Sequence, residues 1–316
     1  GGGGPSSSDF DEASGGAIST STSTSTATPL LSWPPGPPMR SRRSGGAAAE
    51  LLCGRILVAG GCCGGGIDLS SSAELYDPST ETWSRCPKMG TKRSGPAAAT
   101  LGDGRVLVVG GCCEGASAPA AASSSSERLR TTELYDPRTE SWSYGPEMIV
   151  RRGFPAAVAL RDGRVLVAGG NDGSSRRLRS SELYDPAAGS WSSGPDMTTA
   201  RSGATAAVLP SSGEVLVVGG YDGRYHLRST ELYDPEASPA GRWRAGPDLC
   251  TGGRSGQAAA AVLRRTGMVV VAGGYDGTRD LISTELFDPD EEAWTWTRGP
   301  DMLLGRSDPV VATLPS

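Results

Sequence analysis

A recurring phrase constrains the fold of this chain more than any other feature of its sequence. One copy, at residues 181–197, reads SELYDPAAGSWSSGPDM. A glycine pair precedes each copy: Gly60–Gly61, Gly110–Gly111, Gly169–Gly170, Gly219–Gly220 and Gly273–Gly274. A tryptophan follows each pair: Trp83, Trp142, Trp191, Trp243 and Trp294. The glycine pairs are 50, 59, 50 and 54 residues apart, and one shared period of this length is typical of a repeated structural unit.

Each unit contains four segments with strand character. In one unit they are AAVAL (156–160), RVLVAGG (164–170), SELYDP (181–186) and the tryptophan segment that follows. Glycine before the second segment and Asp-Pro at the end of the third are turn signals. The alanine-rich first segments are too short for a stable helix, and the second segments are apolar on both faces, as in a sheet covered on both sides. Four antiparallel strands repeated about an axis predict a β-propeller.

The order of double glycine, tyrosine and tryptophan resembles the kelch repeat. The segment GGYDGTRDLISTELFDPDEEAW, residues 273–294, is close to a full consensus of that repeat. The resemblance covers residues 33–316 and implies an all-β, kelch-type β-propeller with five complete four-stranded blades. Within a blade, we expect Tyr184 and Trp191 to be apolar anchors that pack toward the neighbouring blade.

The two ends of the repeat region predict an incomplete sixth blade. The segment SWPPGPPM (32–39) looks like a fourth strand, and RSDPVVATLPS (306–316) looks like a first strand. The alternative is a ring of five blades. Residues 1–32 are rich in Gly, Ser and Thr, which predicts a disordered segment before a propeller at 33–316; a phosphorylated Ser/Thr tract is the less favoured interpretation. Because the chain begins with Gly1 rather than Met, we expect the natural protein to extend further upstream.

Charge and cysteine content limit the classes of partner and compartment. Thirty basic and 35 acidic residues give a net charge of −5, which does not favour nucleic acid or an anionic membrane surface. No apolar run approaches the roughly 20 residues of a membrane span. Seven irregularly spaced cysteines argue against a disulfide framework and for a reducing compartment, so we expect a cytoplasmic, monomeric propeller.

The sequence offers little for catalysis. His226 is the single histidine, whereas a kelch-fold copper oxidase, by resemblance, would need two histidine ligands. We interpret His226 as a solvated loop residue rather than a catalytic one. The aspartates that recur with the repeat precede proline and act as turn formers; they are Asp77, Asp136, Asp185, Asp234 and Asp288. We therefore expect no catalytic residues and no enzymatic activity.

Two cysteine pairs stand where other units have GGND or GGYD. Cys62, Cys63, Cys112 and Cys113 occupy equivalent loop positions in adjacent units. Four thiolates would suit zinc, but adjacent cysteines lack the CxxC spacing that lets one loop chelate. We favour simple substitution by a small residue over a metal site or a redox-sensitive site. The glycine-rich loops also lack the GxxxxGK[ST] pattern, so we predict no metal and no cofactor.

Binding residues are better indicated than catalytic ones. Strands alternate in direction, so the loop between the second and third strands and the loop between blades emerge on one face. The interblade loops carry a repeated arginine: Arg43, Arg93, Arg152, Arg201, Arg254 and Arg306. The other loops carry Asn171, Tyr221 and Tyr275 directly after the glycine pair. In kelch-type substrate adaptors, by resemblance, the matching residues line a peptide pocket.

The arginines also have a structural interpretation, which the sequence leaves open. Each would form an ion pair inside the blade with the glutamate of the ELYDP segment, namely Glu74, Glu133, Glu182, Glu231 and Glu285. A third interpretation is surface arginine that reflects codon bias. The Ala/Ser-rich insertion at 116–126 is interpreted as a flexible, tolerated lengthening of one loop.

These observations favour a non-catalytic protein–protein interaction module that binds a partner on the arginine-bearing face. Converging arginines predict an acidic or phosphorylated protein or peptide. The resemblance implies a ubiquitin-ligase substrate receptor, or an actin or signalling scaffold. The alternative is a kelch-fold enzyme that acts on a small molecule in the central channel, which the single histidine disfavours.

Overall fold

The computed structural model describes residues 36–62, 70–113, 127–174, 176–238, 240–256 and 258–309. All of them belong to one compact unit, Leu31–Ser316. Residues 1–32, Trp33, Cys63, the insertion at 116–126 and residues 310–316 lie outside the described residues. The prediction of a disordered N-terminal segment therefore stays a prediction.

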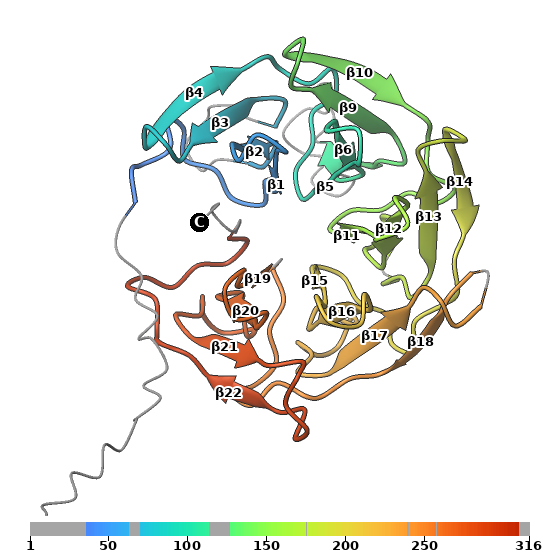
Figure 1. The fold of residues 1–316 in the computed structure, drawn as a ribbon, viewed down its shortest axis with the longest axis vertical. Coiled ribbons are helices and arrows are strands. Elements are labelled where there is room, and N and C mark those ends of the chain that lie inside the picture. The colour runs from blue at the N-terminus through green and yellow to red at the C-terminus, as the bar shows by residue number, and fades with distance from the viewer. Residues whose placement is uncertain are drawn as a thin grey trace, which may run out of the picture. The chain divides into compact units, whose positions relative to one another are not determined.

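Five four-stranded antiparallel sheets surround a common axis (Figure 1). Blade one is β1 (Ala47–Glu50), β2 (Ile56–Ala59), β3 (Ala73–Asp77) and β4 (Thr82–Cys86). Blade two is β5 (Ala97–Thr100), β6 (Val106–Val109), β9 (Thr132–Asp136) and β10 (Ser141–Gly145). Blade three is β11 (Ala156–Ala159), β12 (Val165–Ala168), β13 (Ser181–Asp185) and β14 (Ser190–Ser193).

Blade four is β15 (Thr205–Val208), β16 (Val215–Val218), β17 (Thr230–Asp234) and β18 (Arg242–Ala245). Blade five is β19 (Ala259–Val262), β20 (Val269–Ala272), β21 (Thr284–Phe287) and β22 (Trp296–Arg298). A short extra hairpin joins β7 (Cys112–Cys113) to β8 (Glu127–Arg128). The first strand of each blade faces the axis and the fourth strand forms the rim (Figure 1). The prediction of an all-β propeller with five complete blades is confirmed.

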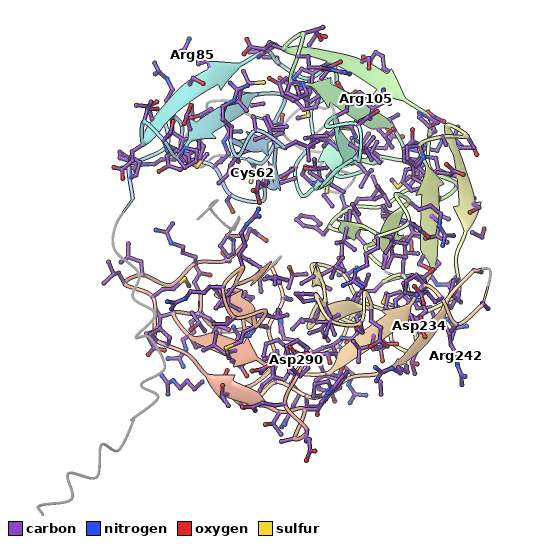
Figure 2. The ribbon with its side chains drawn as sticks, viewed as in Figure 1. Cys62, Arg85, Arg105, Asp234, Arg242 and Asp290 are labelled. Atoms are coloured by element: carbon purple, nitrogen blue, oxygen red, sulfur yellow. The ribbon has the colours of Figure 1, made fainter. Side chains whose placement is uncertain are left out.

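Apolar burial between blades holds the ring together. Every residue of the second strands β2, β6, β12, β16 and β20 is buried, because each of these strands has a blade or a core on both faces. Four hydrophobic clusters connect blades one and two, two and three, three and four, and four and five. Polar side chains such as Arg85 and Arg242 lie at the outer rim (Figure 2).

The tyrosine–tryptophan pair within each blade is a cross-strand contact. Tyr184 lies opposite Trp191, and their ring centroids are 5.1 Å apart. Tyr184 is buried in the cluster shared with blade two, and Trp191 packs against that cluster. The predicted anchor role of this pair is confirmed.

In blade five, Trp294 was predicted to be the tryptophan of the fourth strand, and this prediction is wrong. Trp296, rather than Trp294, pairs with Phe287 and is 4% exposed. The paired residues Phe287 and Trp296 are two positions further apart in the sequence than Tyr184 and Trp191, so the later tryptophan reaches the pairing position. Trp294 stacks edge-on against Phe287 instead.

The predicted sixth blade falls mostly outside the described residues. The described parts of its two predicted strands, residues 36–39 and 306–309, form no strand. The Pro37 carbonyl accepts a hydrogen bond from Trp83 Nε1 at 3.1 Å, as the Pro87 carbonyl accepts one from Trp142 at 2.8 Å. Residues 36–39 therefore lie where the end of a preceding blade would lie, and the sixth blade stays a prediction.

The glycine pair is a structural requirement of the blade junction. Gly169 has a φ of +68°, and a Cβ atom at this position would lie 2.3 Å from the Arg201 carbonyl oxygen. The next amide, that of Gly170, donates to the same carbonyl at 2.7 Å. The next blade's arginine therefore approaches so closely that only glycine fits before the turn.

We expect Gly169→Ala to lower the free energy of unfolding by at least about 3 kcal/mol, because it combines a left-handed backbone with a steric clash. Gly189→Ala is the matched control: its φ is +63°, and nothing lies within 4 Å of the added Cβ. The control should lose only about 1 kcal/mol. Urea unfolding measures both, and equal losses would contradict a role for close approach.

Candidate binding face

Two sets of loops meet on one face of the propeller. Ser202 and Tyr221 form a β-bridge in which each amide donates to the other's carbonyl, at 3.0 and 2.8 Å. The same bridge joins four other pairs: Ser44–Cys62, Ser94–Cys112, Gly153–Asn171 and Ser255–Tyr275. The prediction that these loops share a face is confirmed. We call the surface formed by these ten residues the glycine-pair face.

The repeated arginines are buried beneath this face. Their side chains are at most 2% exposed in five cases, and each pairs with the glutamate of its own blade's third strand. The shortest N–O distances are 2.7 Å for Arg43–Glu74, 3.1 Å for Arg93–Glu133, 2.9 Å for Arg152–Glu182, 3.1 Å for Arg201–Glu231 and 2.6 Å for Arg254–Glu285. We call each such pair an arginine–glutamate clamp.

In the clamp of blade four, Arg201 uses all three of its guanidinium nitrogens. Nη1 donates to the carbonyls of Gly219 and Ser229 at 2.8 and 2.7 Å, while Nε donates to Glu231 at 3.1 Å. Nη2 donates to Ser229 Oγ at 2.9 Å. The Glu231 carboxylate also accepts from the amides of Thr198 and Thr199 at 2.7 and 3.0 Å. A charge buried this deeply requires such a counter-charge and such hydrogen bonds.

The clamps correct the predicted ligand-facing role of Arg93, Arg152, Arg201 and Arg254. These side chains are turned into the blade and neutralised there, as the structural interpretation expects. Burial lowers the pKa of the Arg201 guanidinium, although the Glu231 carboxylate opposes that shift. Arg306 differs from the others because it is exposed and forms no ion pair within the part of the chain that the structure describes.

Aromatic side chains form the most developed feature of the glycine-pair face. His226 lies between Tyr221 and Tyr275, with ring-centroid distances of 4.9 and 5.5 Å. Its Nδ1 is 2.8 Å from Ser255 Oγ. All three rings are half-buried, so each keeps one part packed and another part open to solvent. We call these three residues the Tyr–His–Tyr cluster.

Sequence reasoning missed His226 by treating it as a solvated loop residue. Its loop folds back in a β-bridge to Tyr221, which brings the imidazole over the aromatic ring. The other contacts come from blade five, through Ser255 and Tyr275. The short spacing between Tyr221 and His226 was a local signal of this contact, whereas the contribution of blade five had no local signal.

Asn171 continues the face into blade three but is 4% exposed. Its side-chain amide donates to Ser202 Oγ at 3.2 Å and to the Gly153 carbonyl at 3.3 Å, and its oxygen accepts from Arg128 Nε. The Arg177 guanidinium lies 5.2 Å from the centre of the Tyr221 ring, in cation–π geometry. Asn171 therefore positions its neighbours, while Tyr221, Tyr275 and Arg177 are the more accessible groups.

Cys62 and Cys112 occupy equivalent positions on this face, as the sequence indicates. Cys62 lies toward the centre of the ring (Figure 2) and is exposed, whereas Cys112 is buried. Burial raises the pKa of the Cys112 thiol to about 11, so it is a protonated thiol at neutral pH. Cys63 lies outside the described residues, among which no group of three or more His, Cys, Asp or Glu side chains could hold a metal ion. The absence of a metal stays a prediction.

The alanine-lined part of the central channel has no ionisable side chain among its described residues, whereas a cavity beside the turns that follow the first strands is lined in part by Glu50, Arg161 and Arg264. A cavity of about 130 Å³ on the axis is lined by the first strands and the residues before them, chiefly alanines, with Pro96, Pro155, Pro309 and Thr205. None of these side chains ionises.

The described residues also contain no helix that is long and apolar enough to span a membrane.

We expect Arg201→Ala to lower the free energy of unfolding by about 3–5 kcal/mol, because it leaves the Glu231 carboxylate buried and unpaired. The matched control is Arg179→Ala, since Arg179 pairs with Asp196 at 3.0 Å but is 62% exposed. Loss of that surface pair should cost less than about 1 kcal/mol. Circular dichroism during urea unfolding measures both variants. If both variants lose a similarly small amount of unfolding free energy, the clamp does not stabilise the fold.

The environment of Asp308 predicts that the free energy of unfolding depends on pH. Burial raises the pKa of its carboxyl to about 6; the hydrogen bond from Ser44 Oγ opposes the shift and the charge of Asp280 adds to it. Between about pH 4 and 6 the unfolded carboxyl ionises first, so the contribution of Asp308 to stability falls as pH rises through this window. Relative to Asp308→Asn, the native chain should lose roughly 1–2 kcal/mol across it. The free energy of unfolding of both proteins is measured by urea unfolding from pH 4 to 7. A difference between the two proteins that stays constant over this range would contradict the assignment.

Comparison with known proteins agrees with this architecture. The family model of the Kelch motif matches residues 43–90, 93–149, 152–198, 200–249 and 253–303. Each match contains one blade. No curated protein sequence is significantly similar to the chain.

Among solved structures, one entitled "Structure of YjhT" matches with a TM-score of 0.70. The match covers 87% of this chain and 88% of that chain at 13% sequence identity. An identity this low shows a shared fold alone.

Proposed function

Because the chain belongs to the kelch family, whose motif matches all five blades, we propose that it is a non-catalytic interaction module. It binds a partner protein through the glycine-pair face. Fold alone does not decide function, so the proposal rests on the residues of that face.

The Tyr–His–Tyr cluster is the observation that carries the proposal. Tyrosine is among the residue types that contribute most at protein interfaces, because its ring buries much area and its hydroxyl stays polar. The hydrogen bond of His226 to Ser255 and the two ring contacts fix the cluster before a partner arrives. Such preorganisation lowers the entropic cost of binding.

Charges around the cluster favour a carboxylate-bearing partner. The clamped arginines are neutralised, so the preference for an acidic segment moves to Arg177 beside Tyr221. Two acidic residues of these loops accept hydrogen bonds within their own turns: Asp222 accepts from the amides of Arg224 and Tyr225 at 2.7 and 2.6 Å, and Asp276 accepts from that of Thr278 at 2.8 Å. An acidic residue next to an apolar or aromatic one would complement both Arg177 and the cluster.

The alternative of an enzyme in the central channel has less support. The alanine-lined cavity on the axis offers no general acid or base, and the ionisable groups nearest to it, Asp308 and the paired Glu50 and Arg264, contribute to contacts between blades five and one. Binding at the glycine-pair face serves a ubiquitin-ligase substrate receptor and an actin or signalling scaffold alike. The identity of the partner distinguishes these roles.

A photo-cross-linking amino acid at Tyr275 tests the proposal in the native source. We expect a specific protein adduct there, and none from the same group at Leu52, which is 73% exposed in a turn on the opposite face. With the purified partner, Tyr221→Ala and His226→Ala should each weaken binding about tenfold or more, with little change in melting temperature. Leu52→Ser is the surface control.

Two outcomes would count against the glycine-pair face. One is an adduct at Leu52 with none at Tyr275. The other is affinity that stays unchanged in the Tyr221 and His226 variants. Either outcome would place recognition elsewhere on the propeller.

A further inference from the structure

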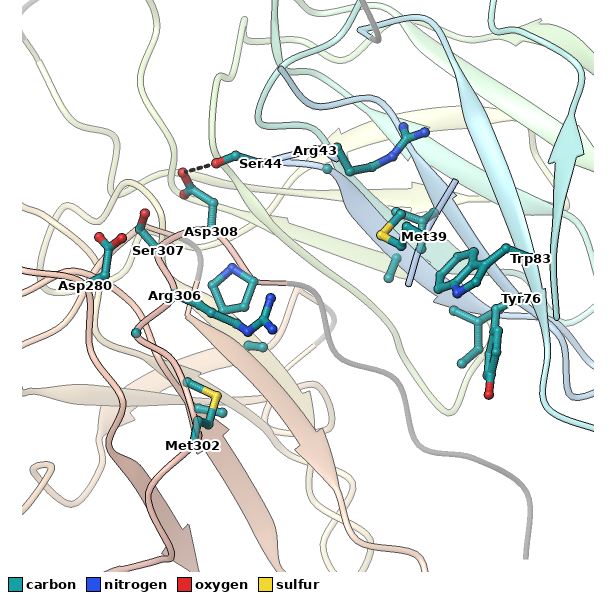
Figure 3. A pocket seen from close by; sticks show the side chains of 18 residues that line it. Met39, Arg43, Ser44, Tyr76, Trp83, Asp280, Met302, Arg306, Ser307 and Asp308 are labelled. Carbon is teal, nitrogen blue, oxygen red and sulfur yellow. Dashed lines mark hydrogen bonds between the residues drawn. The ribbon is translucent and has the colours of Figure 1, made fainter. Parts of the chain in front are cut away.

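A cleft separates blade five from blade one. It encloses about 620 Å³ between a wall that includes Tyr76 and Trp83 and a wall that includes Met302 and Arg306 (Figure 3). Near the axis, Ser44 Oγ donates to Asp308 at 3.3 Å (Figure 3). At the opposite face, Arg264 pairs with Glu50. The two blades are therefore linked at the axis and separated further out.

Side chains in both walls are more exposed than their equivalents in the other blades. Tyr76 is half-buried, although the third-strand aromatics of the other blades are at most 2% exposed: Tyr135, Tyr184, Tyr233 and Phe287. Met302 is half-buried, whereas its equivalents are at most 4% exposed: Met89, Met148, Met197 and Leu249. Each wall therefore presents the apolar surface that a blade normally buries against its neighbour.

The cleft also contains half of an arginine–glutamate clamp. The Arg306 carbonyl accepts from the Gly274 amide at 2.8 Å, just as the Arg201 carbonyl accepts from Gly170 at 2.7 Å. The backbone of Arg306 is thus in the register of the repeat. Within the described residues, however, its guanidinium meets no carboxylate.

Backbone amides complete this half-clamp. In blades two to four, the amides three and two residues before the arginine donate to the glutamate of the clamp: Gly90 and Thr91, Ile149 and Val150, and Thr198 and Thr199. The equivalent amides here belong to Leu303 and Leu304, which form no hydrogen bond within the described part of the chain. One guanidinium and two amides at the edge of an apolar cleft are therefore the equivalents of the groups that hold a carboxylate in the other blades.

We propose that this cleft binds a β-hairpin of a partner polypeptide whose second strand reads glutamate, leucine, aromatic. The glutamate would accept from Arg306 and from the amides of Leu303 and Leu304. The aromatic ring would pack toward Met302, as Tyr135 packs in the cluster that contains Met89. The other side of the hairpin would cover Tyr76 and Ile56.

The occupant is a segment outside these 316 residues. The chain contains five Glu-Leu-aromatic sequences, and each already forms the third strand of its own blade. Residues 36–39 already occupy the place that follows a fourth strand, as the Trp83–Pro37 hydrogen bond shows. This inference is independent of the glycine-pair face, and either can fail alone.

A tethered probe tests the proposal in the full chain. A copy of residues 212–235, which contain β16 and β17, is joined directly after Ser316. We expect the melting temperature to rise by about 5 °C or more, because the walls become buried. An extension of the same composition in scrambled order is the control and should produce no such rise.

A double-mutant cycle identifies the contact. Arg306→Ala, and Glu→Gln at the copied Glu231, should each remove more than half of the rise, and together they should remove little more. The melting temperature of each substituted chain is also measured with the scrambled extension in place of the copied segment. A rise that is insensitive to both substitutions, or equal to that of the control, would overturn the proposal.

A second format keeps the test decisive if the extended chain fails to fold. Synthetic peptide 212–235 is added in trans to the unextended chain, and fluorescence anisotropy measures its binding. Arg306→Ala should weaken the affinity at least tenfold, and absence of binding in both formats would overturn the proposal. A second copy of the chain is the alternative occupant, and sedimentation of the unextended chain tests it. A dimer that dissociates in the Arg306→Glu variant would show that the cleft binds a second copy instead of the proposed partner.

Discussion

The arginine–glutamate clamp is the interaction on which the rest of the structure depends. Each clamp ties the segment that enters a blade to that blade's third strand, and its guanidinium also holds backbone carbonyls of the second-to-third-strand loop. The glycine pair makes the close approach possible, because a Cβ atom there would collide with the arginine carbonyl. Two features that look separate in the sequence are therefore one junction.

This junction also determines what the glycine-pair face offers to a partner. The clamps place five positive charges beneath the surface and cancel them there. Recognition is left to groups above the clamps, chiefly the Tyr–His–Tyr cluster and Arg177. A buried ion pair that fixes a loop and a surface ring that meets a partner have different roles, although they lie a few residues apart.

The sequence predicted the propeller and its blades because those depend on local, repeated signals. Turn residues, alternating strands and the Tyr184–Trp191 pair each recur at fixed spacing. The burial of the arginines in ion pairs was not predictable in the same way. Arg152 and Glu182 lie 30 residues apart, and spacing does not show whether a side chain turns inward. Trp294 was chosen by consensus spacing, and a longer turn moved Trp296 into its place. The environment of His226 depends on Ser255 in the next blade.

The cleft gives the assembly of blades two distinct ends. Four apolar cores join five blades in order, while the described residues of blades five and one share no such core and are joined by contacts such as Ser44–Asp308 and Glu50–Arg264. In energetic terms the described part of the molecule is a linear array of nearest-neighbour units rather than a circle. Fluctuations that open the structure should begin at its first and last blades. A segment seated in the cleft would make every blade an interior one, so that local opening anywhere would require breaking two interfaces instead of one.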